Sequence, residues 1–136
     1  MTDELALSVI LPVHDEAENL PILWKEVAEV LPALASSAEV IFVDDGSTDG
    51  SAEIIRNLAR QDSRIRLLRF EKNAGLSAAF HAGFQAARGR IVATLDSDLQ
   101  NDPNDLPALV ARLDGADAAV GMRLIRHDSL VKRVSS

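Results

Sequence analysis

The 136-residue sequence contains no cysteine and no tyrosine, and its only aromatic residues are four phenylalanines and one tryptophan. The absence of cysteine excludes disulfide bonds and thiolate metal sites, and it fits a reducing compartment. Because aromatic residues are few, the core must be built mainly from Val, Ile, Leu and Ala in a chain that is 47% hydrophobic. This length and composition predict a single domain over residues 1–136.

The sequence has no apolar run long enough to cross a bilayer. The N-terminal run Leu5–Val13 is interrupted by Ser8 and Pro12, and it is far shorter than the roughly 20 residues that a spanning helix needs. Asp3 and Glu4 stand where a secretory signal carries basic residues. We therefore expect these residues to be cytoplasmic, neither secreted nor membrane-spanning.

Positive charge is scarce except at the C-terminal end. The net charge of −7 argues against a nucleic-acid-binding protein, so we expect no nucleic-acid partner. Residues 122–136 reverse this sign, with Arg123, Arg126, Lys132 and Arg133 against Asp128 alone. An acidic body with a short basic end is the first sign of functional organisation.

Several common catalytic patterns are also missing. There is no Gly-rich phosphate loop of the Walker or dinucleotide type, which excludes ATPase and NAD-dependent functions. The three histidines, His14, His81 and His127, have neither a zinc-binding spacing nor a triad partner pattern.

What is present is an alternation of apolar runs and helical patterns. The expected strands are Leu7–Val13, Glu39–Val43, Ile65–Phe70, Ile91–Leu95 and Ala116–Val120. Apolar residues at helical spacing predict helices over 20–34, 51–60, 76–87 and 106–113. Strands that alternate with helices form right-handed βαβ units, so we predict a Rossmann-like α/β fold with a mostly parallel sheet flanked by helices.

The unusual polar residues follow the expected strands. In such a sheet, ligands bind at the carboxyl ends of the strands, where all five chain exits would meet. The exits are 12–16, 44–47, 73–75, 96–100 and 121–123. Acidic and amide groups that are far apart in the sequence are therefore expected to converge.

The fourth exit has the composition of a cation site. Asp96 and Asp98 are one residue apart after a buried strand, and Gln100 could add a neutral oxygen. Hard oxygen ligands suit Mg²⁺ or Mn²⁺, which keep positions for water and substrate phosphates. The alternative is that these aspartates only cap turns, with Asn101 or Asp102 starting the next helix.

The second exit is more ambiguous. Turn formation and helix capping by Thr48 or Asp49 account for residues 46–50 without any function. They do not explain why Asp44 and Asp45 are adjacent at the end of an apolar strand. A carboxylate there could accept hydrogen bonds from a nucleobase N–H or a ribose hydroxyl.

The third exit leads into a helix rich in small residues, which we interpret as close packing of that helix on the sheet. Its small residues are Ala78, Ala79, Ala82, Gly83, Ala86, Ala87 and Gly89. His81 is expected on its surface.

Three segments together resemble glycosyltransferase family 2 of the GT-A fold. They are Val9–Glu16 (VILPVHDE), Val43–Asp49 (VDDGSTD) and Asp96–Gln100 (DSDLQ), in the order typical of that family. The tail, Val120–Arg123 followed by Arg126–Ser129, is similar to the polyprenol-phosphate branch. That branch includes dolichyl-phosphate mannose synthases and the undecaprenyl-phosphate aminoarabinose and glucose transferases.

The resemblance implies a metal-dependent transfer of sugar from a UDP- or GDP-sugar to a polyprenyl phosphate at the cytoplasmic face of a membrane. The implied nucleoside pocket is formed by Pro12, His14, Glu16, Val43 and Asp45, with hydrogen bonds from Glu16 and Asp45. The implied diphosphate, ribose and metal ligands are Asp96, Ser97, Asp98 and Gln100. Arg123 would reach the diphosphate, which makes Asp98 and Arg123 the expected catalytic residues. His14 departs from the tyrosine often found at its position.

The acceptor follows from charge. Departure of the nucleoside diphosphate develops negative charge, which a divalent ion and Arg123 would stabilise. A lipid phosphate is already an anion and needs no strong general base, whereas a saccharide hydroxyl does. The sequence offers no convincing base, which favours the lipid phosphate over a saccharide acceptor in cell-surface polysaccharide synthesis.

Members of this family continue beyond the segment that corresponds to 126–129. Leu130–Val134 resembles the opening of a helix, so we expect a donor-binding domain without its acceptor-side elements and any membrane segment. The basic end would face anionic lipid headgroups or the acceptor phosphate.

Two other classes of protein share parts of this pattern. A phosphoreceiver domain places its acidic pair after the first strand and a lysine after the fifth, where this chain has Gly121 and Arg123. A nucleotidyltransferase carries a Gly-rich basic loop after the first strand, where this chain has the acidic segment Asp15–Glu18.

Overall fold

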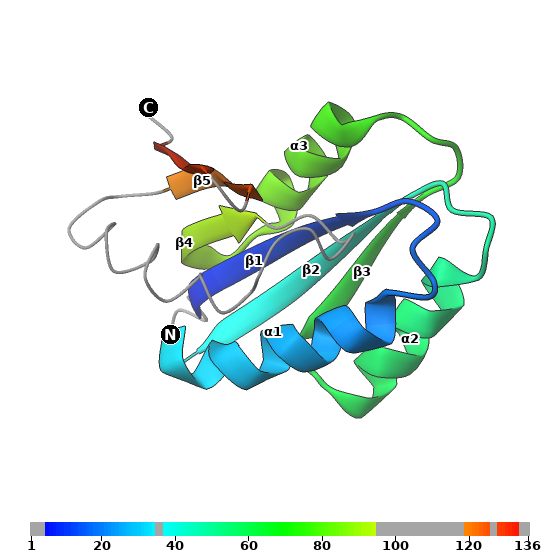
Figure 1. Ribbon diagram of the computed structural model, residues 1–136, viewed down its shortest axis with the longest axis horizontal. Helices are drawn as coiled ribbons and strands as arrows, with labels where there is room; N and C mark the ends of the chain where they lie inside the picture. Colours follow the sequence, from blue (N-terminus) through cyan, green and yellow to red (C-terminus); the bar gives the residue numbers. More distant parts are fainter. Residues whose placement is uncertain (1–4, 35–36, 95–118, 126–127, 134–136) are drawn as a thin grey trace.

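The computed structural model describes residues 5–34 and 37–94, and the backbone of 119–125 and 128–133. Its main sheet has four parallel strands in the order β3-β2-β1-β4 (Figure 1). They are β1 (Leu5–Val13), β2 (Ala38–Asp45), β3 (Ile65–Phe70) and β4 (Gly89–Thr94). The sequence therefore predicted each of these strands to within a few residues.

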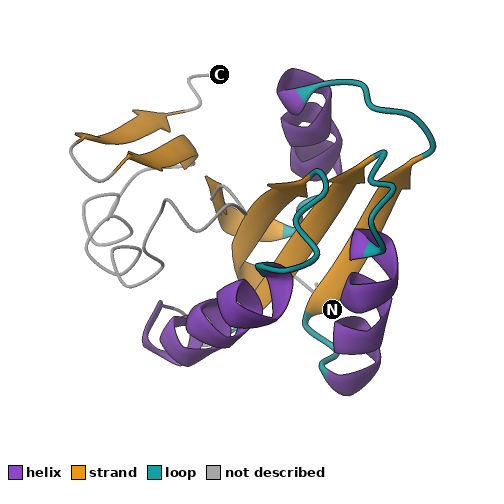
Figure 2. Cartoon of the chain, turned by 45° about the vertical axis from the view of Figure 1, so that its right-hand side comes forward, coloured by secondary structure: helices purple, strands orange, loops and turns teal. Residues whose placement is uncertain are grey.

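Three helices cover the two faces of this sheet. The helices α1 (Leu20–Leu34) and α2 (Ser51–Gln61) lie on one face, and α3 (Leu76–Ala86) lies on the other (Figure 2). The connections β1–α1–β2 and β2–α2–β3 run in one direction along the sheet. The connection through α3 returns past β1 to β4 on the opposite face, as right-handed crossovers require.

The alternation of side chains along each strand divides the core into two layers. Val9, Leu11 and Phe42 pack under α1 and α2, whereas Ile10 and Ile41 pack under α3. Each of these side chains is fully buried, and burial of one such side chain contributes about 1.5–3 kcal/mol. Strands that are apolar on both faces are what a sheet covered by helices needs.

The small residues of α3 bring it close to the sheet, as predicted. A Cβ added at Gly83 would lie 2.5 Å from Cγ2 of Ile10, and Ala79 is fully buried. His81 is exposed on the outer side of the helix. The first turn of α3 is therefore held close to the carboxyl end of the sheet.

The prediction of a fifth parallel strand over Ala116–Val120 is wrong for the residues that are described. The strand β5 (Ala119–Ile125) pairs antiparallel with β6 (Asp128–Arg133) in a separate two-stranded sheet that lies beside β4. Residues 121–123, expected beyond a strand end, lie inside β5, and 130–133 form strand instead of helix. Only two residues separate β5 from β6, a connection that permits antiparallel pairing but is too short for a parallel crossover.

No helix in the described part of the chain has the length and apolar character to cross a membrane. The expected helix over 106–113 lies outside the described residues.

A buried ionic network closes the end of the sheet opposite the strand exits. Glu39 is 2% exposed, and its carboxylate accepts hydrogen bonds from the Ser8 hydroxyl (2.6 Å), the Arg88 N–H (2.8 Å) and the Arg66 guanidinium (2.8 Å). Burial alone would raise the pKa of Glu39, but these hydrogen bonds outweigh it and hold the pKa below its ordinary value. Asp62, which accepts hydrogen bonds from Arg64, also has a lowered pKa.

We expect acid to weaken the fold through these carboxylates. A carboxyl whose pKa is depressed in the folded state contributes stability that is complete above its unfolded pKa and is lost as the pH falls through the folded pKa. The loss should therefore be concentrated below about pH 4. Urea unfolding at a series of pH values measures it, and Glu39→Gln should show a shallower acid dependence than the unchanged chain. An equally steep dependence in that variant would contradict the role given to Glu39.

Candidate functional site

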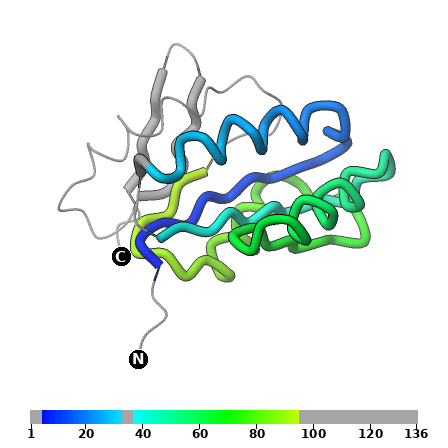
Figure 3. Tube along the Cα trace, turned by 90° about the horizontal axis from the view of Figure 1, so that it is seen from below, coloured from blue at the N-terminus to red at the C-terminus, as the bar shows by residue number. Residues whose placement is uncertain are grey.

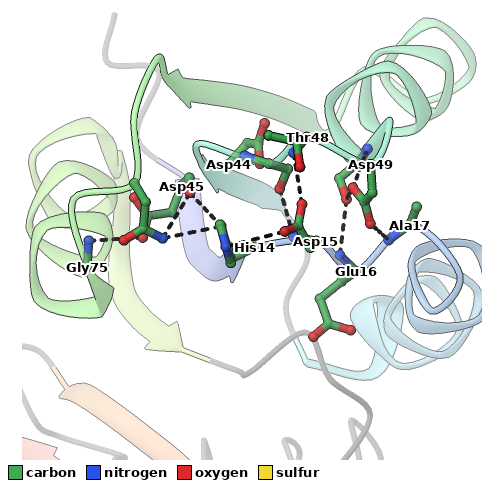
Figure 4. A network of polar contacts seen from close by, with 12 residues as sticks. His14, Asp15, Glu16, Ala17, Asp44, Asp45, Thr48, Asp49 and Gly75 are labelled. Atoms are coloured by element: carbon green, nitrogen blue, oxygen red, sulfur yellow. Dashed lines mark hydrogen bonds and ion pairs between the residues drawn. The ribbon is translucent and has the colours of Figure 1, made fainter.

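Three loops meet at the carboxyl end of the sheet. They are the β1–α1 loop (14–19), the β2–α2 loop (46–50) and the β3–α3 loop (71–75). Figure 3 shows them gathered at the end of the molecule away from the N-terminus. The β2–α2 loop is the middle one, and both of its neighbours are hydrogen-bonded to residues in it or beside it (Figure 4).

Asp15 joins the β1–α1 loop to the β2–α2 loop. Its backbone N–H donates to Ser47 Oγ at 2.9 Å, and its Oδ1 accepts from the Thr48 N–H at 2.8 Å. Its φ of 51° lies in the left-handed region, which Asp tolerates better than most residues. This reciprocal pair holds the backbone of the β1–α1 loop in place.

Asp49 makes the second connection between these loops. Its Oδ2 accepts from the Ala17 N–H at 3.0 Å, and its Oδ1 accepts from the Ser51 N–H and hydroxyl at the start of α2. Ser51 Oγ in turn accepts from the Glu16 N–H at 3.1 Å. Slight burial raises the pKa of Asp49, but the hydrogen bonds from Ser51 and Ala17 give a net lowering. The N-cap position of α2 is occupied by Gly50, and of the two residues expected to cap this helix it is Asp49 that accepts the N–H of the first helical residue, Ser51.

Asp45 joins the β2–α2 loop to the β3–α3 loop. Its two carboxylate oxygens accept hydrogen bonds from the backbone N–H groups of Ala74 (2.6 Å) and Gly75 (3.0 Å). The residue is 5% exposed. One carboxylate therefore holds the entry to α3, because both N–H groups lie just before the first helical residue.

Asp44 points to the other face of the sheet, because neighbouring strand residues alternate. It is fully buried, its Oδ1 accepts from the Ser47 N–H at 3.2 Å, and its Oδ2 lies 3.7 Å from Arg69 Nε. Asp44 Oδ2 has no hydrogen-bond partner within the described residues. The two adjacent aspartates therefore point in opposite directions and have separate partners, apart from the hydrogen bond that Asp44 Oδ2 lacks among the described residues.

His14 lies over Asp45 with a defined ring orientation. Its Nδ1 is 2.7 Å from the carbonyl oxygen of Asp45, a distance at which a protonated Nδ1 donates to that oxygen. Nε2 is 3.4 Å from Asp15 Oδ2. The Asn73 side-chain amide approaches the same Asp45 carbonyl at 3.3 Å from the opposite loop. The three loops thus meet around one backbone carbonyl.

These loops enclose a pocket of about 220 Å³. Its lining residues are Pro12, Val13, His14, Asp45, Asn73, Gly75, Leu76 and Ala79. Pro12, His14 and Asp45 are at the pocket as the sequence analysis expected. The pocket is open and its lining is mainly apolar, with Leu76 47% exposed.

Two expected pocket residues lie elsewhere. Val43 is fully buried against Ile10 under α3, so it lies beneath the site. Glu16 lines a neighbouring hollow of about 410 Å³ together with Asp15, Ala17, Glu18, Asn19 and Asp49. Its Oε2 accepts from the Asn19 side-chain amide at 2.8 Å.

The sequence analysis did not predict five of the lining residues, namely Val13, Asn73, Gly75, Leu76 and Ala79. Asn73 stood at a strand exit, which was a usable signal. Leu76 and Ala79 were assigned to packing on the sheet, because the helical spacing of apolar residues does not show which of them also lie beside a loop at the start of the helix.

The residues implied for the metal and the diphosphate are not placed by the structure. Asp96, Ser97, Asp98 and Gln100 lie outside the described residues, and of Arg123 only the backbone is described, in β5 opposite Leu130. Among the residues described, no group of three or more His, Asp or Glu side chains could hold a metal ion. β4 ends at Thr94, which pairs with Ile10, so the chain leaves β4 toward the same edge as the loops.

The sequence profile of glycosyl transferase family 2 matches residues 8–135. The chain belongs to glycosyltransferase family 2. Its four-stranded parallel sheet with flanking helices is accordingly the GT-A fold that the sequence analysis expected. This confirms the resemblance found in the three sequence segments.

Curated relatives within family 2 include two bacterial transferases of one kind. The chain is 42% identical over 137 residues to the undecaprenyl-phosphate 4-deoxy-4-formamido-L-arabinose transferase of Aeromonas hydrophila, covering 99% of this chain and 42% of the relative. It is 39% identical over 132 residues to the transferase of the same name from Salmonella choleraesuis, covering 96% of this chain and 40% of the relative. The chain therefore spans about two fifths of the length of these relatives.

Solved structures of glycosyltransferases have the same fold. The mannosyltransferase PcManGT from Pyrobaculum calidifontis, in complex with GDP-Man and Mn²⁺, has a TM-score of 0.70 at 26% identity, covering 82% of this chain and 33% of that chain. TarS from S. aureus, in complex with UDP-GlcNAc, has a TM-score of 0.66 at 24% identity, covering 82% of this chain and 32% of that chain. At this identity TarS supports the fold alone.

Proposed function

We propose that this chain forms the donor-binding part of a metal-dependent glycosyltransferase that moves a sugar from a nucleoside-diphosphate sugar to a polyprenyl phosphate. The observation that carries the proposal is the pocket of Pro12, His14, Asp45 and Asn73 at the carboxyl end of a parallel sheet in a family 2 chain. Ligands of open α/β sheets bind at this edge. A structure similar to this chain is a complex with GDP-Man and Mn²⁺.

The pocket supplies the groups that a nucleoside needs. Pro12, Leu76 and Ala79 offer apolar surface to a base, and His14 offers the face of an oriented ring. Both carboxylate oxygens of Asp45 accept a backbone N–H of the β3–α3 loop. Each oxygen has a second lone pair, which can accept a hydrogen bond from a base N–H or a ribose hydroxyl. Asn73 adds a side-chain amide at the same wall. Glu16 would contact the donor from the neighbouring hollow.

The diphosphate would be held at the exit of β4. Asp96, Asp98 and Gln100 present oxygen ligands suited to Mg²⁺ or Mn²⁺, with Ser97 beside them. A divalent ion bound there supplies positive charge that stabilises the departing nucleoside diphosphate. Arg123 would add a guanidinium to the same phosphates. Asp98 and Arg123 are therefore the proposed catalytic residues.

The acceptor is proposed from the relatives and from charge. The two curated relatives are undecaprenyl-phosphate transferases, and an acceptor phosphate needs no strong general base. With an acceptor of this kind, we propose that the reaction takes place at the cytoplasmic face of a membrane. The basic residues of 122–136 would then face anionic headgroups, each contributing about 1 kcal/mol near the surface.

Calorimetric titration of the chain with UDP and GDP tests the donor site. We expect binding with Mn²⁺ or Mg²⁺ that chelator abolishes and that Asp98→Ala weakens at least about tenfold, because the cation would lose a charged ligand. Glu53→Ala, which removes an exposed carboxylate on α2, is the matched control and should bind as the unchanged chain does. The tighter nucleotide identifies the donor class. Absence of binding in a folded sample, or binding indifferent to chelator and to Asp98→Ala, would contradict the proposal.

A further inference from the structure

The helix α3 forms one wall of the proposed donor pocket with its first residues. Gly75, Leu76 and Ala79 line that pocket, and Asp45 holds the N–H groups of Ala74 and Gly75. The helix has 11 residues and is therefore about 16 Å long. Its last residues lie at the opposite end of the sheet, far from the pocket.

The far end of α3 is fixed by Glu39 and its partners. Arg66 Nη1 donates at 2.8 Å both to the Ala86 carbonyl at the end of α3 and to Glu39 Oε1. Glu39 Oε2 accepts the Arg88 N–H directly after the helix, at 2.8 Å. Ser8 links Glu39 to the next residue, because its hydroxyl donates to Glu39 at 2.6 Å and accepts the Gly89 N–H at 2.8 Å.

Glu39 therefore holds the segment that connects α3 to β4, directly through Arg88 and indirectly through Arg66 and Ser8. Its carboxylate is 2% exposed, so loss of its charge would leave the Arg88 N–H, the Ser8 hydroxyl and Arg66 with one acceptor fewer in a buried place. A Cβ added at Gly89 would lie 2.5 Å from the Ser8 N, so this junction has no spare room. We expect the end of α3 to move when these donors lose their acceptor, because they need new partners.

The middle of α3 transmits such a movement instead of absorbing it. Gly83 contacts Ile10 so closely that the helix cannot approach the sheet further, and a short helix moves as one body. A tilt about Gly83 that displaces Ala86 would displace Leu76 and Ala79 in the opposite sense. Asp45 holds the N–H groups of Ala74 and Gly75 at the start of α3, so this tilt would move the Leu76–Ala79 wall relative to a fixed entry.

We propose that Glu39 is a positioning residue for the donor pocket: by anchoring the end of α3 from the opposite end of the sheet, it sets the position of the Leu76–Ala79 wall. This inference rests on the proposed function for its effect on nucleotide binding. It predicts that substitution of Glu39 changes nucleotide affinity, although the length of α3 separates Glu39 from the pocket.

The test uses the full chain with Glu39→Gln, which keeps the side-chain volume and removes the charge. Arg66→Gln is the second variant, because it leaves Ser8 and Arg88 bonded to Glu39 and removes the hydrogen bonds from Arg66 to the Ala86 carbonyl and to Glu39. The control is Ile55→Val, a core change under α2 on the other face, which lowers stability without touching α3. Hydrogen exchange of the 74–82 amides and calorimetric affinity for UDP and GDP with Mn²⁺ are measured well below each melting temperature.

We expect both variants to weaken nucleotide binding about fivefold and to speed exchange at 74–82 beyond what Ile55→Val causes. Unchanged exchange at 74–82 in both variants would overturn the inference, whether or not nucleotide binds. Equal effects of Ile55→Val would also overturn it, because the cause would then be global stability. If the unchanged chain binds no nucleotide while exchange at 74–82 still responds to Glu39→Gln, the proposed function fails and the anchoring of α3 stands.

Discussion

Replacement of Gly46 by alanine is expected to lower the free energy of unfolding by about 3 kcal/mol. Gly46 has a φ of +70°, and an added Cβ would lie 2.4 Å from the Asn73 N and 2.7 Å from the Lys72 carbonyl carbon. Both neighbours are backbone atoms, which cannot turn away as the end of a flexible side chain can. The β2–α2 and β3–α3 loops would have to separate at the wall of the pocket.

Gly50 provides the matched control. Its φ of +91° is also in the left-handed region, but a Cβ there meets nothing within 4 Å. Gly50→Ala should therefore cost only the conformational strain, about 1 kcal/mol. Urea denaturation of both variants gives the two values. Equal losses would mean that the contact between the two loops does not limit the side chain at residue 46.

Replacement of Asp45 by alanine is expected to lower nucleotide affinity at least about a hundredfold and to cost about 3 kcal/mol of stability. Two losses together lower the nucleotide affinity. The proposed acceptor for the base or ribose is lost, and the N–H groups of Ala74 and Gly75 lose the carboxylate that holds the entry to α3. The stability cost comes from the second effect alone.

Asp45→Asn separates these effects. Its side-chain carbonyl can still accept one of the two N–H groups, while its NH₂ faces the other donor. We expect a smaller loss of stability than in Asp45→Ala, together with a clear loss of affinity. Unfolding curves and calorimetry on the same samples measure both quantities. If Asp45→Asn bound nucleotide as the unchanged chain does, Asp45 would act only on the loop and not on the donor.

The end of β2 and the β2–α2 loop serve both the stability of the pocket and its proposed binding of the donor. Asp45 and Asp49 hold the backbones of the flanking loops, and Ser47 accepts the Asp15 N–H. Residues that the family resemblance assigns to substrate are thus also the residues that build the pocket. For substitutions in this segment, both the free energy of unfolding and the nucleotide affinity should be measured, because one quantity alone does not separate a role in the loops from a role in binding.

Much of the fold was determined by the sequence itself. Apolar runs and helical spacing predicted β1 to β4 and α1 to α3 to within a few residues. This is possible because buried positions recur along the chain with the period of a strand or of a helix. Pro12, His14 and Asp45 were placed at one edge for a similar reason, since all strands of a parallel sheet exit on the same side. These inferences needed only neighbours along the chain and a topological rule.

Other features depended on partners that are distant in the chain. The separate partners of Asp44 and Asp45, the location of Val43 beneath the pocket and the anchoring of α3 by Glu39 all arise from contacts between separate elements. Nor could an apolar run at 116–120 reveal that β5 would pair with β6, because periodicity records which residues are buried and not which strand lies beside them. The sequence determined the elements and the edge that carries the site. Tertiary packing decided which side chains line the pocket and which hold its loops in place, because both sets of contacts depend on how separate elements pack against one another.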